Sequence, residues 1–185
     1  MKFCYYWYQD IYKPAQIKKI NKFILANPNP KLKDKPSDKA VKTAKVSVLD
    51  LNTLRNCEAM NNIEDLIDST NNQFFNFTTR NFTRFDCVNH NIYKANVEGQ
   101  YEWHYDGELF DKGYTSKLTA LINLSEKEYE GGDFYIWWGE PLHVKEFKKP
   151  GAVLIFPSFM AHKVTPVTKG ERITLAVWKK GPWWQ

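Results

Sequence analysis

The chain has 185 residues, which is long enough for one sizeable hydrophobic core, and we expect a single domain over residues 1–185. Aromatic residues make up 16%, a share that favours β structure with a deep pocket. The net charge of +5 permits an acidic partner but does not require nucleic acid. Three widely spaced cysteines (Cys4, Cys57 and Cys87) argue against a disulfide scaffold and for a reducing compartment. No apolar run reaches membrane length, so we expect a cytoplasmic protein without membrane contact.

The first quarter of the chain predicts an extended segment, a helix and a polar loop. Residues 1–12 are aromatic and favour a strand or an extended arm. Residues 14–26 predict an amphipathic helix, because Pro14 suits the first turn and apolar residues recur at helical spacing. Residues 27–45 interleave prolines with lysines and contain few apolar side chains, which predicts a surface loop.

The next segments predict further supporting elements. Residues 46–49 favour a strand, and residues 57–70 favour a second amphipathic helix. Residues 74–85 are rich in aromatics and favour strands. We therefore expect residues 1–80 to form a largely helical support that covers one face of the structure that follows.

The C-terminal half contains short apolar or aromatic runs that are separated by glycine and proline turn signals. Four runs have this character: residues 117–124, 130–138, 150–157 and 162–178. Short strands at such spacing predict an all-β sandwich or barrel.

Three elements of this half have the spacing of a metal site: His104-Tyr105-Asp106, His162 and Arg172. On a strand, His104 and Asp106 point to the same face, because side-chain direction alternates. His162 completes a set of two imidazoles and one carboxylate that leaves three positions open, which suits non-haem Fe(II). Arg172 adds a fixed cation for a dicarboxylate. The pattern predicts an Fe(II) oxygenase that uses 2-oxoglutarate and O2.

Plainer interpretations exist for the same residues. A His-x-Asp pair occurs by chance in many chains, and His162 alone fits a hydrogen-bonded core or surface histidine. Glu102, His104 and Asp106 alternate with aromatics, so their shared face is either a solvated surface or the polar wall of a pocket.

Other candidate residues have simpler explanations. We expect His90 at a loop or sheet edge and His143 on a solvated edge strand. Trp178 fits core packing, although its alternation with Arg172 and Thr174 points it toward the predicted site.

Longer motifs surround the metal pattern. They are Tyr93 with Gly99-x-Tyr101-x-Trp103-His104-x-Asp106, Leu118-Thr-Ala-Leu-Ile-Asn-Leu-Ser125 with Tyr129-Glu-Gly-Gly-Asp-Phe134, Gly151 with Phe156-Pro157, and His162-Lys-Val-Thr-Pro-Val with Gly170-Glu-Arg172-x-Thr174 and Trp178. Over about residues 84–179 the chain resembles the prolyl-4-hydroxylase-type Fe(II)/2-oxoglutarate dioxygenases, particularly small bacterial and phage-encoded members. The resemblance implies a double-stranded β-helix, the cupin-like jelly roll, over these residues.

The same resemblance implies roles for individual residues. His104, Asp106 and His162 would hold iron, and Arg172 would bind the distal carboxylate of 2-oxoglutarate. Asn91 and Tyr93 fall where the family often places co-substrate contacts.

The chain departs from the family at one contact. The tyrosine that often binds the co-substrate carboxylate, on the strand after the His-x-Asp pair, is replaced by Asn123 or is absent. Thr119 and Thr174 are the candidate substitutes.

The function that the resemblance implies is hydroxylation of a C–H bond, foremost in a peptidyl proline, with Fe(II), 2-oxoglutarate, O2 and ascorbate. One alternative is the same chemistry on a small molecule, free amino acid, lipid or nucleobase. Another is a non-catalytic jelly-roll binding module whose triad is a relic or a zinc site. A nucleic-acid substrate is disfavoured, because Lys179 and Lys180 stand where a repair oxygenase would carry a further arginine.

Two segments are the expected walls of a substrate entrance. The loop at 107–116 follows Asp106 directly, and the lysine-rich loop at 27–45 has the composition of a segment that orders on binding. If the chain is viral, the expected location is the host cytoplasm. The sequence leaves the oligomeric state open.

Overall fold

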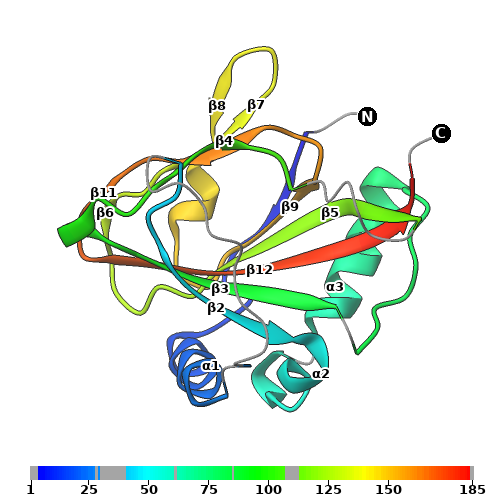
Figure 1. Cartoon of the computed structure of the whole chain (residues 1–185), viewed down its shortest axis with the longest axis horizontal. Helices are drawn as coiled ribbons and strands as arrows, with labels where there is room; N and C mark the ends of the chain where they lie inside the picture. The colour runs from blue at the N-terminus through cyan, green and yellow to red at the C-terminus, as the bar shows by residue number, and fades with distance from the viewer. Residues whose placement is uncertain are drawn as a thin grey trace.

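The computed structural model describes residues 4–27, 29, 41–60, 62–84, 86–106 and 113–183. Its main feature is a pair of antiparallel sheets that face each other, with helices on the outer face of the larger sheet (Figure 1). The large sheet has the strand order β1-β9-β5-β12-β3-β2, and the small sheet has the order β4-β10-β7-β8. Strands β11 and β6 form a separate ribbon. The expected fold class, mainly β with flanking helices, is confirmed.

The strands and helices have the following bounds. The strands are β1 Tyr6–Tyr8, β2 Lys45–Asp50, β3 Cys87–Lys94, β4 Tyr101–His104, β5 Tyr114–Asn123, β6 Glu130–Gly131, β7 Phe134–Trp137, β8 Pro141–His143, β9 Val153–Pro157, β10 His162–Val164, β11 Val167–Lys169 and β12 Glu171–Pro182. The α-helices are α1 Pro14–Ala26, α2 Leu51–Leu54 and α3 Ile63–Thr70. Short 3₁₀ turns (η1 Glu58–Met60, η3 Ala95–Val97 and η4 Lys145–Lys148) and a π-helical turn (η2 Asn71–Phe75) connect them.

Alternation along the central strands divides the core into two layers. On β5, Ala120 and Ile122 pack toward the helices, whereas Leu121 faces the small sheet. On β12, Leu175 packs toward the helices and Ala176 faces the small sheet. Because successive side chains point to opposite faces, a strand buried on both sides must be apolar on both. This explains the nearly continuous apolar run of β5.

Helix α1 has the bounds that the sequence predicts. Pro14 occupies its first turn, and the Lys13 backbone N–H donates to Gln16 Oε1 at 2.9 Å. Ile17, Ile20 and Ile24 are buried in the layer between the helices and the large sheet. The expected helix at 57–70 is instead divided into η1 and α3.

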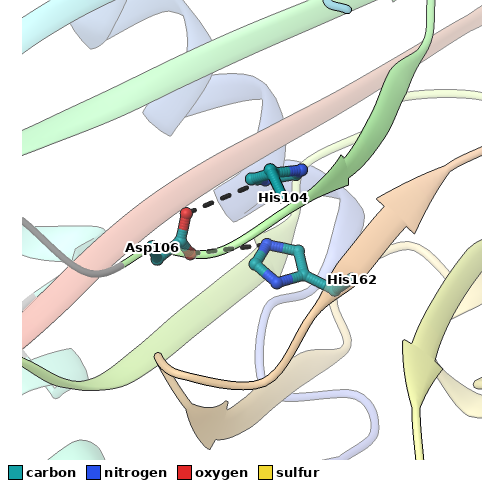
Figure 2. Close-up of side chains that lie close together, drawn as sticks. All are labelled: His104, Asp106 and His162. Carbon is teal, nitrogen blue, oxygen red and sulfur yellow. Dashed lines mark ion pairs between the residues drawn. The ribbon is translucent and has the colours of Figure 1, made fainter.

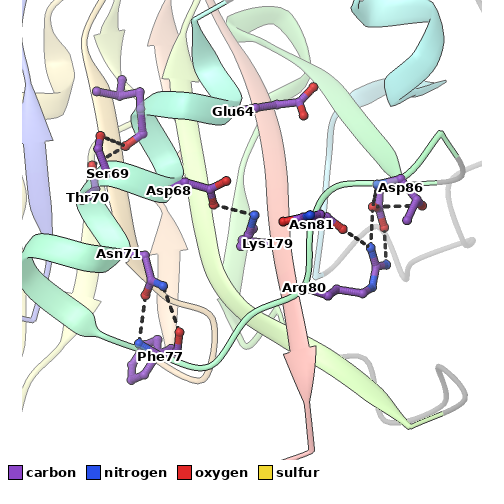
Figure 3. Close-up of polar contacts among 12 residues, drawn as sticks. Glu64, Asp68, Ser69, Thr70, Asn71, Phe77, Arg80, Asn81, Asp86 and Lys179 are labelled. Atoms are coloured by element: carbon purple, nitrogen blue, oxygen red, sulfur yellow. Dashed lines mark hydrogen bonds and ion pairs between the residues drawn. The ribbon is translucent and has the colours of Figure 1, made fainter.

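The expected strands at 74–85 are absent from the described part of that segment. Asn76 has φ of +53°, which ends η2 in the left-handed region. The chain beyond it is held by side chains (Figure 3): Asn71 bonds the backbone N–H and carbonyl of Phe77, and Arg80 forms a fork on Asp86 at 2.6 and 2.9 Å. These contacts satisfy polar groups without a strand ladder, which aromatic composition cannot reveal.

A buried lysine joins α3 to the large sheet. Lys179 on β12 is 2% exposed, and its Nζ lies 2.5 Å from Asp68 Oδ1 on α3 (Figure 3). Its ammonium also lies over the Phe82 ring, 4.3 Å from the centroid. The aromatic segment and α3 are thus fixed against β12 by one charged group.

The two expected entrance segments lie largely outside the described residues. Residues 107–112 and 30–40 belong to this undescribed part, as does residue 28. Among the described residues, no helix is long and apolar enough to span a membrane.

His90 is neither a loop nor an edge residue. It lies within β3, between Ser47 on β2 and Leu175 on β12, and is fully buried. Its Nε2 is 3.0 Å from Asn21 Oδ1, and the Asn21 amide group donates to the Leu124 carbonyl. Because that amide oxygen only accepts, Nε2 carries the proton of a neutral imidazole. Burial, followed by the charge of Lys45, lowers the pKa of His90 from 6.5 to about 4.

His90 should make the stability of the protein fall in acid. Between pH 6.5 and 4 the unfolded chain binds a proton that the folded protein excludes, so stability is lost as the pH falls through this window. The part of this loss that is due to His90 should approach about 3 kcal/mol. Denaturant unfolding of the metal-free protein at several pH values measures it. His90→Gln should remove this component, and an unchanged pH slope in that variant would contradict the assignment.

Candidate metal centre and co-substrate pocket

The predicted metal ligands converge at the facing edges of two paired strands. His104 ends β4, Asp106 follows two residues later, and His162 begins β10 directly opposite His104 (Figure 2). Asp106 Oδ1 lies 3.8 Å from His104 Nε2, and Asp106 Oδ2 lies 3.5 Å from His162 Nε2. One ligand atom from each residue can lie within 4.8 Å of the others, so the cluster could hold one metal ion.

Backbone carbonyls fix the tautomer of both imidazoles. His104 Nδ1 lies 2.7 Å from the Glu102 carbonyl, and His162 Nδ1 lies 2.9 Å from the Met160 carbonyl. A carbonyl only accepts, so each Nδ1 carries a proton and donates, and each Nε2 faces Asp106. Burial, followed by the charge of His162, lowers the pKa of His104 to about 4. His104 is therefore neutral near pH 7 and available as a metal ligand.

Two buried hydroxyl groups orient the Asp106 carboxylate. Thr119 Oγ1 donates to Asp106 Oδ2 at 2.9 Å and lies 2.9 Å from Ser158 Oγ. Because the Thr119 proton goes to the carboxylate, the Ser158 hydroxyl must donate to Thr119. The Asp106 backbone N–H also donates to the Ser158 carbonyl at 3.0 Å. Asp106 is thus held although it lies beyond the end of β4.

The expected alternation along β4 is wrong at one point. The pairing of β4 with β10 changes register, and Tyr101 stacks face to face on His104 with ring centroids 3.4 Å apart. Tyr101 and His104 therefore lie on the same side, which a strict period of two does not allow. His104 and Asp106, whose side chains are each 13% exposed, form a pocket wall, whereas Glu102 is exposed and does not line the pocket.

The pocket beside the triad lies between the two sheets. Asn91 and Tyr93 enter it from β3, and Arg172, Thr174 and Trp178 enter it from β12. These five side chains were singled out from the sequence, and the alternation along β3 and β12 brings them to one face. The same period would have found Asn89 and Ala176, which also line the pocket.

Arg172 is a buried cation without a hydrogen-bonding counter-charge. It is 1% exposed, and its Nε and Nη2 have no hydrogen-bond partner among the described residues. The guanidinium lies near the rings of Tyr93 and Phe147, at 5.1 and 5.6 Å from their centroids. A Cβ at Gly132, where φ is +60°, would meet Arg172 Cδ at 3.0 Å. The packing therefore fixes the guanidinium while leaving its N–H groups for an anion.

Two further buried polar atoms of the pocket-lining residues lack partners within the described structure: Asn91 Oδ1 and Trp178 Nε1. The Asn91 amide nitrogen donates to the Asn89 carbonyl at 3.2 Å, which leaves the acceptor oxygen unpartnered. The indole of Trp178 can only donate. Trp178 therefore contributes a donor to the pocket wall and is more than core packing.

Thr119 and Asn123 have contacts other than the expected ones with a co-substrate. The Thr119 hydroxyl is bound to Asp106, and neither residue is part of the pocket lining. Asn123 Nδ2 donates to the carbonyls of Phe147 and Lys148, both at 3.0 Å, and so holds η4 in place. On β5, the pocket is lined by Leu121.

His143 and Lys42 complete the comparison between the sequence and the structure. His143 lies on the edge strand β8 as expected, but it stacks on Tyr135 and lies 3.8 Å from Asp133. Lys42 lines the pocket and belongs to the segment 27–45 that was expected to border the entrance, but its individual position depends on pairing between distant segments.

Sequence comparison places this site in a known family. Residues 88–180, half of the chain, match the family described as the 2OG-Fe(II) oxygenase superfamily. The description of this family names 2-oxoglutarate and Fe(II), in agreement with the ligands that the sequence predicts. A PKHD-type hydroxylase from Synechococcus sp. (strain CC9605) is 32% identical over 88 residues, which are 47% of this chain and 39% of that protein. The match thus spans about two fifths of the relative's length.

Solved structures share the fold. A Pseudomonas putida prolyl-4-hydroxylase superposes with a TM-score of 0.71 at 15% identity, covering 98% of this chain and 95% of that chain. A viral collagen prolyl hydroxylase from Paramecium bursaria Chlorella virus-1, in complex with 2OG, gives 0.71 at 18% identity and 97% coverage of both chains. The jelly roll and the likeness to the prolyl-4-hydroxylase type are confirmed. The chain belongs to the 2OG-Fe(II) oxygenase superfamily.

Proposed function

We propose that this chain is an Fe(II)- and 2-oxoglutarate-dependent dioxygenase that hydroxylates a C–H bond in a peptidyl proline. The observation that carries the proposal is the buried guanidinium of Arg172, whose Nε and Nη2 have no partner among the described residues, in a pocket that also contains three residues able to hold a metal ion. An unpaired buried charge is costly, so the site is built for an anion. A dicarboxylate co-substrate can meet the cation and the metal together.

The donor set fits Fe(II). The Nδ1 atoms of His104 and His162 are bound to carbonyls, which leaves each Nε2 as the ligand atom, and one carboxylate oxygen of Asp106 lies within 4.8 Å of both. These three residues would hold the ion and leave positions for co-substrate and O2. When bound, the metal and the co-substrate supply the oxidising chemistry that no side chain here can provide.

The co-substrate would be held mainly by donors on β12 and β3. Arg172 would pair with the distal carboxylate, and the hydroxyls of Thr174 and Tyr93 are further donors in the pocket. Asn91 is less suited to a carboxylate, because the atom without a partner is its acceptor oxygen. Leu121 supplies no hydroxyl on β5, so Arg172 would bear a larger share of the binding.

The substrate assignment rests on likeness of fold. The neighbours named above act, by their names, as a prolyl-4-hydroxylase and a collagen prolyl hydroxylase. Both names support a peptide partner, and ascorbate as an iron reductant stays a prediction. Incubation of the protein with Fe(II), ascorbate, 2-oxoglutarate and a panel of proline peptides and small metabolites should yield a peptide heavier by one oxygen atom in mass spectrometry. If only a metabolite gains oxygen, the substrate is a small molecule and not a peptidyl proline.

Loss of the Arg172 cation should weaken the binding of 2-oxoglutarate. A charge-assisted fork contributes roughly 1.5–3 kcal/mol, so Arg172→Ala should raise the apparent KM for 2-oxoglutarate about tenfold or more. Arg172→Lys should give a smaller rise, because an ammonium lacks the fork. Succinate formation at varied 2-oxoglutarate measures both. Unchanged KM values in both variants would place the carboxylate partner elsewhere.

Loss of the buried Thr119 hydroxyl should weaken the binding of the metal ion. Thr119→Val keeps the shape but removes the donor to Asp106 Oδ2, so affinity for the divalent ion should fall about 10- to 100-fold. Calorimetric titration of the apoprotein with Mn²⁺ or with Fe(II) under nitrogen measures it. Thr115→Val is the matched control at another buried threonine of β5. Equal affinities in the two variants would leave Thr119 with no role in orienting the ligand.

A further inference from the structure

The small sheet carries aromatic side chains on the face that points away from the pocket. On β7, Ile136 is buried between the sheets, whereas Tyr135 and Trp137 point to the opposite face. Trp137 is 49% exposed, and Trp138 and Leu142 in the hairpin of β7 and β8, which projects from the rest of the ribbon (Figure 1), are exposed as well. The solvent face of an antiparallel sheet is usually polar, so this face has an unusual composition.

Side chains from all four strands of the small sheet join in this surface, which we call the aromatic platform. Its members are Trp103 on β4, Lys163 on β10, Tyr135 and Trp137 on β7, and His143 on β8. The rings of Trp103 and Trp137 meet edge to face, with centroids 5.7 Å apart. Tyr135 and His143 are stacked, with centroids 4.8 Å apart. Because neighbouring strands carry these rings, their spacing is fixed by the sheet.

A lysine lies between the two aromatic pairs. Its Nζ is 5.1 Å from the ring centroid of Trp103 and 5.7 Å from that of Tyr135. Lys163 alternates with the buried His162 and Val164, so its side chain points away from the pocket. Within the described parts of the chain, its ammonium forms no ion pair with a carboxylate. The platform therefore presents flat apolar rings around a positive charge that has no acidic partner.

These features suit one kind of partner best. Rings that a sheet holds at fixed spacing favour a ligand whose own apolar groups are rigid, and proline-rich segments in the polyproline II conformation dock on aromatic-lined surfaces. The ammonium among the rings favours a segment that also carries a carboxylate. A second copy of the chain fits less well, because a standard interface takes about 20–30 residues from each side. The platform has five described residues.

The platform lies on the other side of the small sheet from the metal ligands. Trp103 directly precedes His104 on β4, and Lys163 directly follows His162 on β10. Neither Trp103 nor Lys163 lines the pocket. A peptide segment on the platform is thus separated from the metal ligands by the thickness of the sheet. Such a segment flanks the reacting proline and does not contain it.

We propose that the aromatic platform is a docking surface for an acidic, proline-rich segment of the peptide substrate. The inference rests on the proposed function and adds how the substrate is held. The flanking segment binds on the rings of Trp103, Tyr135 and Trp137, with a carboxylate beside Lys163, and a proline elsewhere in the same peptide enters the pocket. The polyproline II conformation is already extended and stiff, so docking costs little conformational entropy. A free amino acid gains nothing from this surface.

Peptide binding without turnover tests the proposal. The protein is loaded with Mn²⁺ and 2-oxoglutarate under nitrogen, and calorimetry gives dissociation constants for equally long peptides of Glu-Pro-Pro, Lys-Pro-Pro and Glu-Ala-Ala repeats. The wild type should bind the Glu-Pro-Pro peptide most tightly. Its preference over the Lys-Pro-Pro peptide should be about three- to tenfold and should decrease with added salt, because the carboxylate meets an accessible cation. The Glu-Ala-Ala peptide has the same charges but lacks the proline rings and should bind weakly.

Variants of the platform identify the residues responsible. Trp137→Ala removes an exposed ring and should weaken binding of the Glu-Pro-Pro peptide about tenfold. Trp7→Ala is the matched control, because Trp7 is 40% exposed but lies on β1 in the large sheet, and it should bind like the wild type. Lys163→Met should lose the preference for Glu over Lys while it retains the preference for proline over alanine. The affinity for 2-oxoglutarate should be unchanged in all three variants.

The proposal is overturned if the proline and alanine repeats bind equally, if Trp137→Ala keeps full affinity, or if Trp7→Ala loses as much. A wild-type dimer that Trp137→Ala dissociates in size-exclusion chromatography would also overturn it, because a second copy would then occupy the platform. Failure of the proposed function is a separate result, in which no proline peptide gains oxygen during turnover. The binding assay contains no O2 and does not depend on turnover, so the two failures are distinguishable.

Discussion

The buried charge of Arg172 is the constraint on which the interior of this protein depends. A guanidinium that is 1% exposed must be paired, and here two of its nitrogens have no partner within the described structure. Two aromatic rings and the glycine turn at Gly132 fix it without neutralising it. Asn123, which the sequence comparison with the family placed at a co-substrate contact, instead anchors the turn that carries Phe147. The packing thus holds a buried cation on the face of the large sheet that lines the pocket.

The metal centre is built by a different device, the pairing of two short strands. Antiparallel register places His162 opposite His104, and a backbone carbonyl within two residues of each histidine fixes its tautomer. The Thr119 and Ser158 hydroxyls then orient Asp106, which lies past the end of its strand. Each ligand is therefore directed by local hydrogen bonds, so the site requires few long side chains to hold its geometry.

Patterns with a short period were predictable from the sequence. The bounds of α1, the strands of the C-terminal half and the pocket face of β12 follow from helical or alternating spacing. The predictions that failed concern residues whose positions depend on contacts between distant segments. His90 is buried because β2 and β12 flank its strand and Asn21 meets it from α1. Lys42 reaches the pocket only because its segment pairs with β4, and no local pattern records that pairing.

The most direct test of the account compares two ligands that differ in one carboxylate. Thermal unfolding of the Mn²⁺-loaded wild-type protein is measured with 2-oxoglutarate and with 2-oxopentanoate, which lacks the distal carboxylate. If Arg172 binds the distal carboxylate, 2-oxoglutarate at about 100 times its dissociation constant should stabilise the fold by about 2.7 kcal/mol. At the same concentration, 2-oxopentanoate should stabilise the fold far less. Equal stabilisation by the two ligands would contradict the claim that the pocket is organised around an anion partner for Arg172.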